Sequence, residues 1–180
     1  PKADLVLITH HHRDHLDLAA LEQIIKDNNI IVMTQKCAEQ IEEMSWSPIL
    51  MANWDKRTLG GFSIEAIPAY NLVHKRESGA PFHPKGEGNG YIITFGDKRI
   101  YVAGDTENTP EMKALKGIDA AFIPMNLPYT MGSAMAADAV KAFKPKLLYP
   151  YHTRSKEGDQ VAGFMELMKG FDEVNIRILK

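Results

Sequence analysis

Residues 5–15 of the chain spell Leu-Val-Leu-Ile-Thr-His-His-His-Arg-Asp-His, so an apolar run leads directly into four histidines and an aspartate. Leu5–Thr9 has the length and composition of a buried β-strand. Asp17, shortly afterwards, is suited to cap a helix with Leu18 and Leu21 on one face. The histidine cluster is therefore predicted to lie in the turn between a buried strand and a helix.

This density of imidazole and carboxylate groups indicates a metal site. Zinc and similar cations bind imidazole nitrogen and carboxylate oxygen, and an extended backbone points alternate side chains the same way. His10 and His12 can therefore share one ion, whereas Asp14 and His15, displaced by the turn, would face a second ion. A surface histidine cluster or the remnant of a tag is the alternative, but the flanking strand and capped helix make it the weaker interpretation.

Further ligands must come from distant parts of the chain where other strands end. Asp105 follows the predicted strand Arg99–Val102 within Gly104-Asp105-Thr106, and its carboxylate could bridge two cations. His152 directly follows the predicted strand Leu147–Tyr151. Taken alone, Gly-Asp-Thr is as typical of a turn, and a single histidine is as often structural. Beside the cluster at 5–15, both residues become candidate ligands.

Strand and helix patterns alternate along most of the chain, which is typical of an α/β or layered α/β domain. A length of 180 residues suits one catalytic domain, and we expect residues 1–180 to form it. Residues 71–89, rich in Gly, Pro, Lys and His, are predicted to form a long functional loop. The predicted strands are Leu5–Thr9, Ile30–Met33, Ile49–Ala52, Phe62–Pro68, Tyr91–Phe95, Arg99–Val102, Ala120–Pro124, Leu147–Tyr151 and Val174–Ile178, and the predicted helices follow Asp17, Thr34 and Thr109 or span Ser133–Phe143 and Val161–Met168.

The composition is that of a soluble globular protein with a formal net charge of -2. This charge offers no broad attraction for a polyanion, so nucleic acid is not an expected partner. No apolar run is long enough to span a bilayer, and residues 1–4 lack the pattern of a signal peptide. We therefore expect a cytoplasmic protein that does not act at a membrane. The single cysteine, Cys37, fits a packing role, and the sequence is compatible with a homo-oligomer.

Three motifs resemble the signature of the metallo-β-lactamase superfamily. Thr9–His15 resembles its HxHxDH motif, Gly104-Asp105-Thr106 resembles its later bridging aspartate, and Tyr151-His152 resembles its final histidine. Their order, spacing and placement at strand ends agree over essentially the whole chain. Phe82–Gly86 and Tyr101–Glu107 are also similar to the branch of metal-dependent hydrolases related to ascorbate-6-phosphate lactonase, a group that includes phospholipase-D-like hydrolases.

The resemblance implies a four-layer αββα sandwich with metals at one edge of the sheets. It implies Zn²⁺, one or two ions per chain, with Mn²⁺ and Fe²⁺ as alternatives. Family members have further strands before the one that leads into HxHxDH, so the resemblance also implies that this sequence lacks those N-terminal strands. The implied ligands are His10 and His12 for the first site, Asp14, His15 and His152 for the second, and Asp105 as the bridge between them.

The first site departs from the family pattern at one position. Relatives supply it with another histidine between the HxHxDH motif and the aspartate, but the matching residue here is Asn71. An amide oxygen is a weaker zinc ligand than imidazole, so the site would be weak, empty, filled by another metal, or completed by His74 or His83. Asn71 and His83 are both kept as candidate ligands, against the alternatives of a turn residue and a residue of a covering loop.

The function that these residues favour is hydrolysis by metal-activated water. Asp14 and Asp105 would orient the hydroxide, and Tyr129 is a candidate donor to the developing oxyanion, although it could simply pack in its loop. The substrate is expected to be a small ester, lactone or phosphodiester. Lys75, Arg76 and Lys85 could meet an anionic group on it, although a solvated basic loop is equally consistent with the sequence.

Three other functions compete with the hydrolase. A di-iron redox enzyme of the same fold would favour a carboxylate at the position of His12. A nuclease would need a basic surface and a further domain, and the sequence predicts neither. A non-catalytic metal-binding or regulatory module, with a first site degraded through Asn71, differs from the hydrolase in metal content and turnover.

Overall fold

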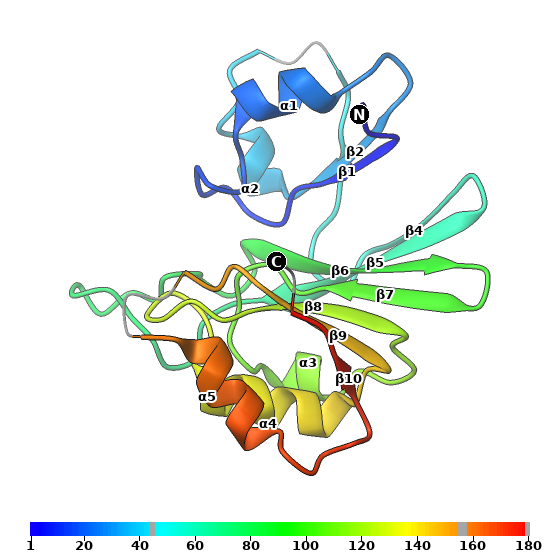
Figure 1. Cartoon of the computed structure of the whole chain (residues 1–180). Coiled ribbons are helices and arrows are strands. Elements are labelled where there is room, and N and C mark those ends of the chain that lie inside the picture. Colours follow the sequence, from blue (N-terminus) through cyan, green and yellow to red (C-terminus); the bar gives the residue numbers. More distant parts are fainter. Residues whose placement is uncertain (44–45, 155–157, 179–180) are drawn as a thin grey trace.

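Two β-sheets lie face to face between two layers of helices in the computed structural model, which describes residues 1–43, 46–154 and 158–178 (Figure 1). The first sheet has three parallel strands in the order β1-β2-β3. Its elements are β1 (Leu5–Leu7), β2 (Ile30–Met33) and β3 (Ile49–Leu50), with helices α1 (Leu18–Ile24) and α2 (Gln35–Ala38) covering its outer face.

The second sheet has seven strands in the order β10-β9-β8-β7-β6-β5-β4. Strands β4 to β7 pair in antiparallel fashion, whereas β7 to β10 are parallel. The bounds are β4 (Lys56–Leu59), β5 (Phe62–Ala69), β6 (Gly88–Phe95), β7 (Lys98–Val102), β8 (Ala120–Pro124), β9 (Leu147–Tyr151) and β10 (Asn175–Ile176).

Three helices cover the other face of the seven-stranded sheet (Figure 1). They are α3 (Pro110–Lys113), α4 (Ser133–Phe143) and α5 (Gln160–Leu167). Their apolar residues pack with the sheet into the largest buried core cluster of the described residues. Helix, sheet, sheet and helix therefore follow one another, which confirms the predicted four-layer αββα architecture.

The alternation of side chains along β2 shows how the sequence separates these layers. Ile31 and Met33 pack against α1 and α2, while Val32 between them packs against the second sheet. All three are almost fully buried. Successive side chains of a strand point to opposite faces, so a strand that is apolar at every position must be covered on both sides.

Several element boundaries differ from those predicted. Strand β4 was not predicted, because its Lys-Arg-Thr-Leu sequence is largely exposed and lacks an apolar alternation. The apolar spacing of Ala38, Ile41 and Met44 predicts a helix longer than α2. The chain turns after Ala38, so α2 ends there, although Ile41 is still buried. Met44 lies outside the described residues. The loop predicted over residues 71–89 ends earlier in the structure, because Gly88 and Asn89 already pair with β5 as part of β6.

No helix among residues 1–43, 46–154 and 158–178 combines the length and the apolar character needed to cross a membrane.

One edge of the two sheets collects the ends of many strands. Strands β7, β8 and β9 are parallel, and β5 runs the same way because two antiparallel pairings separate it from β7. Residues that directly follow these strands therefore meet at one edge. The turn after β1 reaches the same edge, because the Asn89 backbone N–H donates to the Thr9 carbonyl oxygen at 2.9 Å.

Candidate metal centre

The turn after β1 is folded by its own backbone. The N–H groups of His15 and Leu16 both donate to the carbonyl oxygen of His12, at 2.9 and 2.8 Å. Asp17 then caps α1, as predicted, by accepting a hydrogen bond from the Ala20 N–H at 3.0 Å. The reversal brings several histidines of one short segment together at the edge of the sheets.

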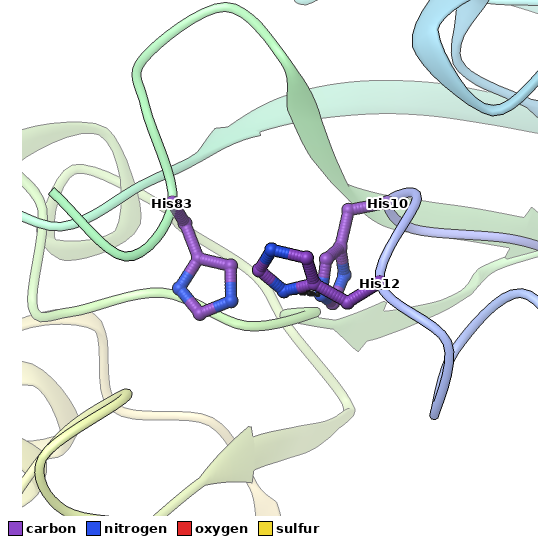
Figure 2. Close-up of side chains that lie close together, drawn as sticks. All are labelled: His10, His12 and His83. Atoms are coloured by element: carbon purple, nitrogen blue, oxygen red, sulfur yellow. Dashed lines mark hydrogen bonds between the residues drawn. The ribbon is translucent and has the colours of Figure 1, made fainter. Parts of the chain in front are cut away.

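His10, His12 and His83 form a first group of candidate ligands. Figure 2 shows their imidazole rings facing one another, His10 and His12 from the turn after β1 and His83 from the long loop between β5 and β6. One nitrogen from each ring lies within 4.8 Å of the other two. His10 and His83 are buried, and His12 is partly exposed. Three imidazoles at one point form a donor set suited to zinc.

Asp14, His15 and His152 form a second group, with one ligand atom each inside the same 4.8 Å limit. His152 Nε2 lies 3.4 Å from Asp14 Oδ2, and His15 Nε2 lies 3.6 Å from that oxygen. His152 follows β9 with a backbone φ of 50°, a conformation that few residues other than glycine adopt. Such backbone strain concentrates at functional sites.

Asp105 lies between the two groups. Its Oδ1 is 3.1 Å from His152 Nδ1 and 3.4 Å from His15 Nε2, and its Oδ2 is 3.5 Å from His83 Nε2. One oxygen therefore faces the second group and the other faces the first. A carboxylate in this position has the geometry needed to bridge two cations.

The distances between the nitrogen and oxygen atoms of the candidate ligands fit shared cations better than hydrogen bonds. His15 Nε2, His83 Nε2, Asp105 Oδ1 and His152 Nδ1 are buried and have no hydrogen-bond partner among the described residues. Buried polar atoms without partners are rare, and an ion is one of the standard explanations. Two ligand atoms bound to one tetrahedral zinc ion lie about 3.4 Å apart, and the Asp105 contacts have similar lengths. The residues present therefore fit a divalent metal.

Gly104 allows the Asp105 turn to approach the turn after β1. Its φ is +67°, and a Cβ atom there would lie 2.9 Å from the Asn89 carbonyl oxygen and 3.0 Å from the Thr9 Cβ. Glycine is the residue that combines a positive φ with such close packing. This contact holds the Asp105 carboxylate beside the histidine cluster.

The histidines of the first group are poised as neutral ligands. Burial, strengthened by the charge of His15, lowers the pKa of His10 to about 2, and burial likewise lowers the pKa of His83 to about 4. Burial alone would raise the pKa of Asp105, but His152 and His15 beside it lower that pKa to about 2. At neutral pH the group therefore offers imidazole lone pairs and a carboxylate, which are the protonation states that bind a metal.

These pKa values predict how the stability of the metal-free protein depends on pH. Below pH 6.5 the unfolded chain protonates His10 and His83, whereas the folded chain does so only near pH 2 and pH 4. The unfolded state binds more protons, so stability should fall as pH drops from 6.5 to 4.5, by up to about 1.4 kcal/mol per pH unit for each histidine. The pKa of His152 is raised mainly by its contact with Asp105, so its contribution to stability changes above pH 6.5, outside this range.

Urea unfolding of EDTA-treated protein at pH 6.5, 5.5 and 4.5 measures this dependence. The His83→Gln variant, which carries no titrating group at position 83, should show a shallower loss of stability than the wild type. Equal slopes for the two proteins would contradict the expectation.

Asn71 holds His83 and does not itself join the group. Its Oδ1 accepts from the His83 backbone N–H and lies 2.8 Å from His83 Nδ1, while its Nδ2 donates to Glu107 Oε1 and to the Tyr129 carbonyl oxygen. These contacts use both lone pairs and both N–H groups of the amide. His83 must donate from Nδ1, which leaves its Nε2 lone pair directed at the centre. Of the two residues that the sequence left open, the structure thus brings His83 to the centre.

Asn71→Ala should weaken binding of a divalent ion to the group His10, His12 and His83 by about 10- to 100-fold, the usual effect of removing an outer partner of a metal-bound histidine. Titration with Zn²⁺ against a chromophoric chelator measures the affinity. Asn175→Ala, which removes an exposed amide far along the chain, is the control and should bind as the wild type does. Wild-type affinity in Asn71→Ala would contradict the positioning role.

Glu107 is a buried residue that sequence reasoning missed. Its carboxylate is fully buried and accepts from the backbone N–H groups of Leu72, Val73 and His74 at 2.7 to 2.8 Å. It also contacts Asn71 Nδ2 at 3.0 Å and His74 Nδ1 at 2.6 Å. Burial alone would raise the pKa of Glu107, but these hydrogen bonds, with that from Asn71 the strongest, lower it. His74, a candidate to complete the first site, is thus held by Glu107 instead.

A cavity of about 250 Å³ opens onto the centre. Tyr129 lines it beside Phe82, with the two ring centroids 5.0 Å apart. Asn126 lines it as well, and its Oδ1 is buried without a hydrogen-bond partner in the described part of the chain. The described residues that line the cavity are His12, Asp14, Arg76, Phe82, His83, Asp105, Asn126, Tyr129 and His152.

Comparison with known proteins finds a matching family model and related sequences. A family model described as the beta-lactamase superfamily domain matches residues 1–152. A UPF0173 metal-dependent hydrolase from Thermococcus kodakarensis is 34% identical over 156 residues, which make up 84% of this chain and 67% of that protein. Another, from Pelotomaculum thermopropionicum, is 31% identical over 155 residues with coverage of 84% and 67%. The chain thus spans about two thirds of the length of these relatives.

Solved structures show the same fold. The crystal structure of a Parabacteroides distasonis protein, assigned in its description to the metal-dependent hydrolases, is 40% identical with a TM-score of 0.86, and covers 99% of this chain and 76% of its own. Igni18, a metallo hydrolase from Ignicoccus hospitalis, has 22% identity and a TM-score of 0.78 over 99% of this chain and 77% of its own, a similarity of fold alone. The chain therefore belongs to the metallo-β-lactamase superfamily and, within it, to the UPF0173 family of metal-dependent hydrolases.

Proposed function

We propose that this protein hydrolyses a small ester, lactone or phosphodiester at a centre of one or two divalent cations, Zn²⁺ first, with Mn²⁺ and Fe²⁺ as alternatives. The observation that carries the proposal is the position of Asp105, with one oxygen toward His15 and His152 and the other toward His83. When bound, the cations would lower the pKa of a water molecule and polarise the oxygen of the bond to be cleaved. The proposed ligands are His10, His12 and His83 for one ion, Asp14, His15 and His152 for the other, and Asp105 for both.

Asp14 and Asp105 are the proposed catalytic carboxylates. Asp105 is buried and would orient the attacking water, whereas the Asp14 side chain is 64% exposed and lies at the cavity. Asp14 would take a proton from the water as the oxygen of that water bonds to the carbonyl carbon or phosphorus. The bond to the leaving oxygen then breaks, and the proton passes from Asp14 to that oxygen. An ester gives an acid and an alcohol, a lactone gives a single hydroxy acid, and a phosphodiester gives a phosphomonoester and an alcohol, with water as the only other reactant.

Tyr129 is the proposed hydrogen-bond donor to the oxygen that gains charge during the reaction. Support comes from its place in the cavity wall and from its backbone, where the Tyr129 N–H donates to the Asn126 carbonyl oxygen at 2.9 Å. Contact with the Phe82 ring further restricts the phenol. A donor held in place before the reaction begins lowers the barrier without reorganising.

The cavity supports a small substrate. A volume of about 250 Å³ suits a molecule with few heavy atoms, since pockets for drug-sized ligands generally exceed about 300 Å³. Within the range of esters, lactones and phosphodiesters, the resemblance of Phe82–Gly86 and Tyr101–Glu107 to the ascorbate-6-phosphate lactonase branch favours a lactone or a phosphorylated compound.

Elemental analysis of protein purified without added metal, followed by a substrate screen, tests the proposal. The expected result is one or two divalent cations per chain and turnover of at least one substrate among p-nitrophenyl esters, simple lactones and bis(p-nitrophenyl) phosphate. One tightly held ion without any turnover would favour a non-catalytic metal-binding or regulatory module. Absence of any bound or bindable divalent ion would refute both functions.

A further inference from the structure

We infer that Arg76 forms an anion-binding subsite in this cavity, so that the substrate carries a carboxylate or phosphate group in addition to the bond that is cleaved. The inference rests on the proposed hydrolytic function and names the substrate class. Among the described residues that line the cavity, Arg76 is the one with a permanent positive charge. The other polar lining residues are histidines, aspartates, an asparagine and a tyrosine.

The guanidinium of Arg76 is available to a ligand. No carboxylate of the described residues lies within 4.0 Å of it. Its Nη2 donates one long hydrogen bond, at 3.4 Å, to the Phe82 carbonyl oxygen. A guanidinium has five N–H donors in a planar fork that matches the oxygens of a carboxylate or phosphate. Most of this donor capacity is therefore not used by the hydrogen bonds within the described protein.

Two local features hold Arg76 in position. Its backbone lies in a tight turn, with the Arg76 N–H donating to the Ala80 carbonyl oxygen at 2.8 Å and the Gly79 N–H donating back to the Arg76 carbonyl oxygen at 2.9 Å. Its guanidinium carbon lies 5.2 Å from the centroid of the Phe82 ring. Stacking on an aromatic ring leaves the edge of the guanidinium open for hydrogen bonds. The arginine is thus presented by a folded turn and an aromatic support.

Arg76 lines the same cavity as the candidate metal ligands His12 and His83. Asp14 and Asp105 also line the cavity and would repel an anion, but both belong to the proposed metal-binding set, where bound cations would offset their charge.

The other two cations considered from the sequence are not placed in this way. Lys85 pairs with Glu111 at 2.8 Å and donates to the Tyr70 hydroxyl at 3.3 Å, and it is not among the residues lining the cavity. Lys75 also lies outside that lining. The geometry thus selects Arg76, with the rings of Phe82 and Tyr129 beside it to contact the uncharged part of the substrate.

A pair of matched esters tests the inference. The neutral ester is p-nitrophenyl hexanoate, and the anionic ester is mono-p-nitrophenyl adipate, which has the same chain length and leaving group but ends in a carboxylate. Arg76→Ala should lower kcat/KM for the adipate about 10- to 100-fold, mainly through KM, because a charge-assisted bidentate contact is lost. It should leave kcat/KM for the hexanoate within about twofold. Arg76→Lys should fall between, since an ammonium cannot form the paired contact.

Lys75→Ala is the matched control, because it removes an exposed cation one residue away that does not line the cavity. It should leave both esters unaffected. Equal losses on both esters in Arg76→Ala, or no loss on either, would overturn the inference.

Binding measurements separate this inference from the hydrolase proposal. Calorimetry with benzoate and with phenylphosphonate, on Zn²⁺-loaded protein, compares the two anion classes without requiring turnover. If no ester is hydrolysed but Arg76→Ala weakens binding of either probe by tenfold or more, the hydrolase proposal fails and the anion subsite stands. If wild type binds neither probe, or if Arg76→Ala binds both as well as wild type does, the subsite is refuted.

Discussion

Replacing Asp105 by alanine is expected to abolish hydrolytic activity and to remove at least one metal ion per chain. Asp105 is the only carboxylate of the described residues that contacts side chains of both candidate ligand groups, at 3.1 to 3.5 Å. Without it, neither proposed ion would keep its full set of ligands, and the proposed water between them would lose its anchor. We expect metal affinity to fall by more than the ~100-fold that loss of an outer partner causes. Elemental analysis after dialysis and single-turnover assays measure the two losses.

Asp97→Ala is the matched control for this variant. Asp97 lies in the turn between β6 and β7, its side chain is 84% exposed, and it pairs with the neighbouring Lys98. Its removal should leave metal content and turnover unchanged. Full metal content and full activity in Asp105→Ala would overturn the assignment of the bridge.

Replacing Glu107 by alanine is expected to destabilise the fold by about 3 kcal/mol, the lower end of the range for breaking a buried charged network. The carboxylate accepts from three consecutive backbone N–H groups, so its loss leaves those donors and one of the two Asn71 amide N–H groups without an acceptor. His83 loses its support through Asn71, so metal affinity at the first group should fall as well. Urea unfolding measures the stability, and hydrogen exchange at residues 72–74 reports the release of the loop.

Glu77→Ala, an exposed position in the same loop, provides the comparison and should change stability by less than about 0.5 kcal/mol. Glu107→Gln should behave more like Glu107→Ala than like wild type, because one of its amide N–H groups would face a backbone N–H. A loss below about 1 kcal/mol in Glu107→Ala would show that the loop is held by other contacts.

Most of the fold could be predicted from the sequence because its strands are either uniformly apolar or clearly bounded. Strands Ala120–Pro124 and Leu147–Tyr151 and helix Ser133–Phe143 have the predicted bounds. Strand β4 could not be found, since Lys56–Leu59 pairs through its backbone at the edge of the sheet and buries little. At the opposite edge of the sheet a strand was predicted over Val174–Ile178, but β10 spans only Asn175–Ile176.

Part of the candidate site could likewise be predicted from the sequence, and part could not. The residues of the HxHxDH segment, Asp105 and His152 could be predicted as a group, because each directly follows a strand whose end lies at the same edge. The relation between Asn71 and His83 could not, since it depends on how an 18-residue loop folds back on itself. Glu107 carried no local signal either, because an acidic residue after Gly-Asp-Thr looks the same whether it faces solvent or anchors backbone N–H groups.

The most direct test of the account is an anomalous diffraction map from crystals of the Zn²⁺-loaded protein, recorded on both sides of the zinc absorption edge. We expect two peaks, one among His10, His12 and His83 and the other among Asp14, His15 and His152, with an oxygen of Asp105 bound to each. A fully loaded crystal without a peak at this centre, or with its zinc bound elsewhere on the chain, would contradict the account.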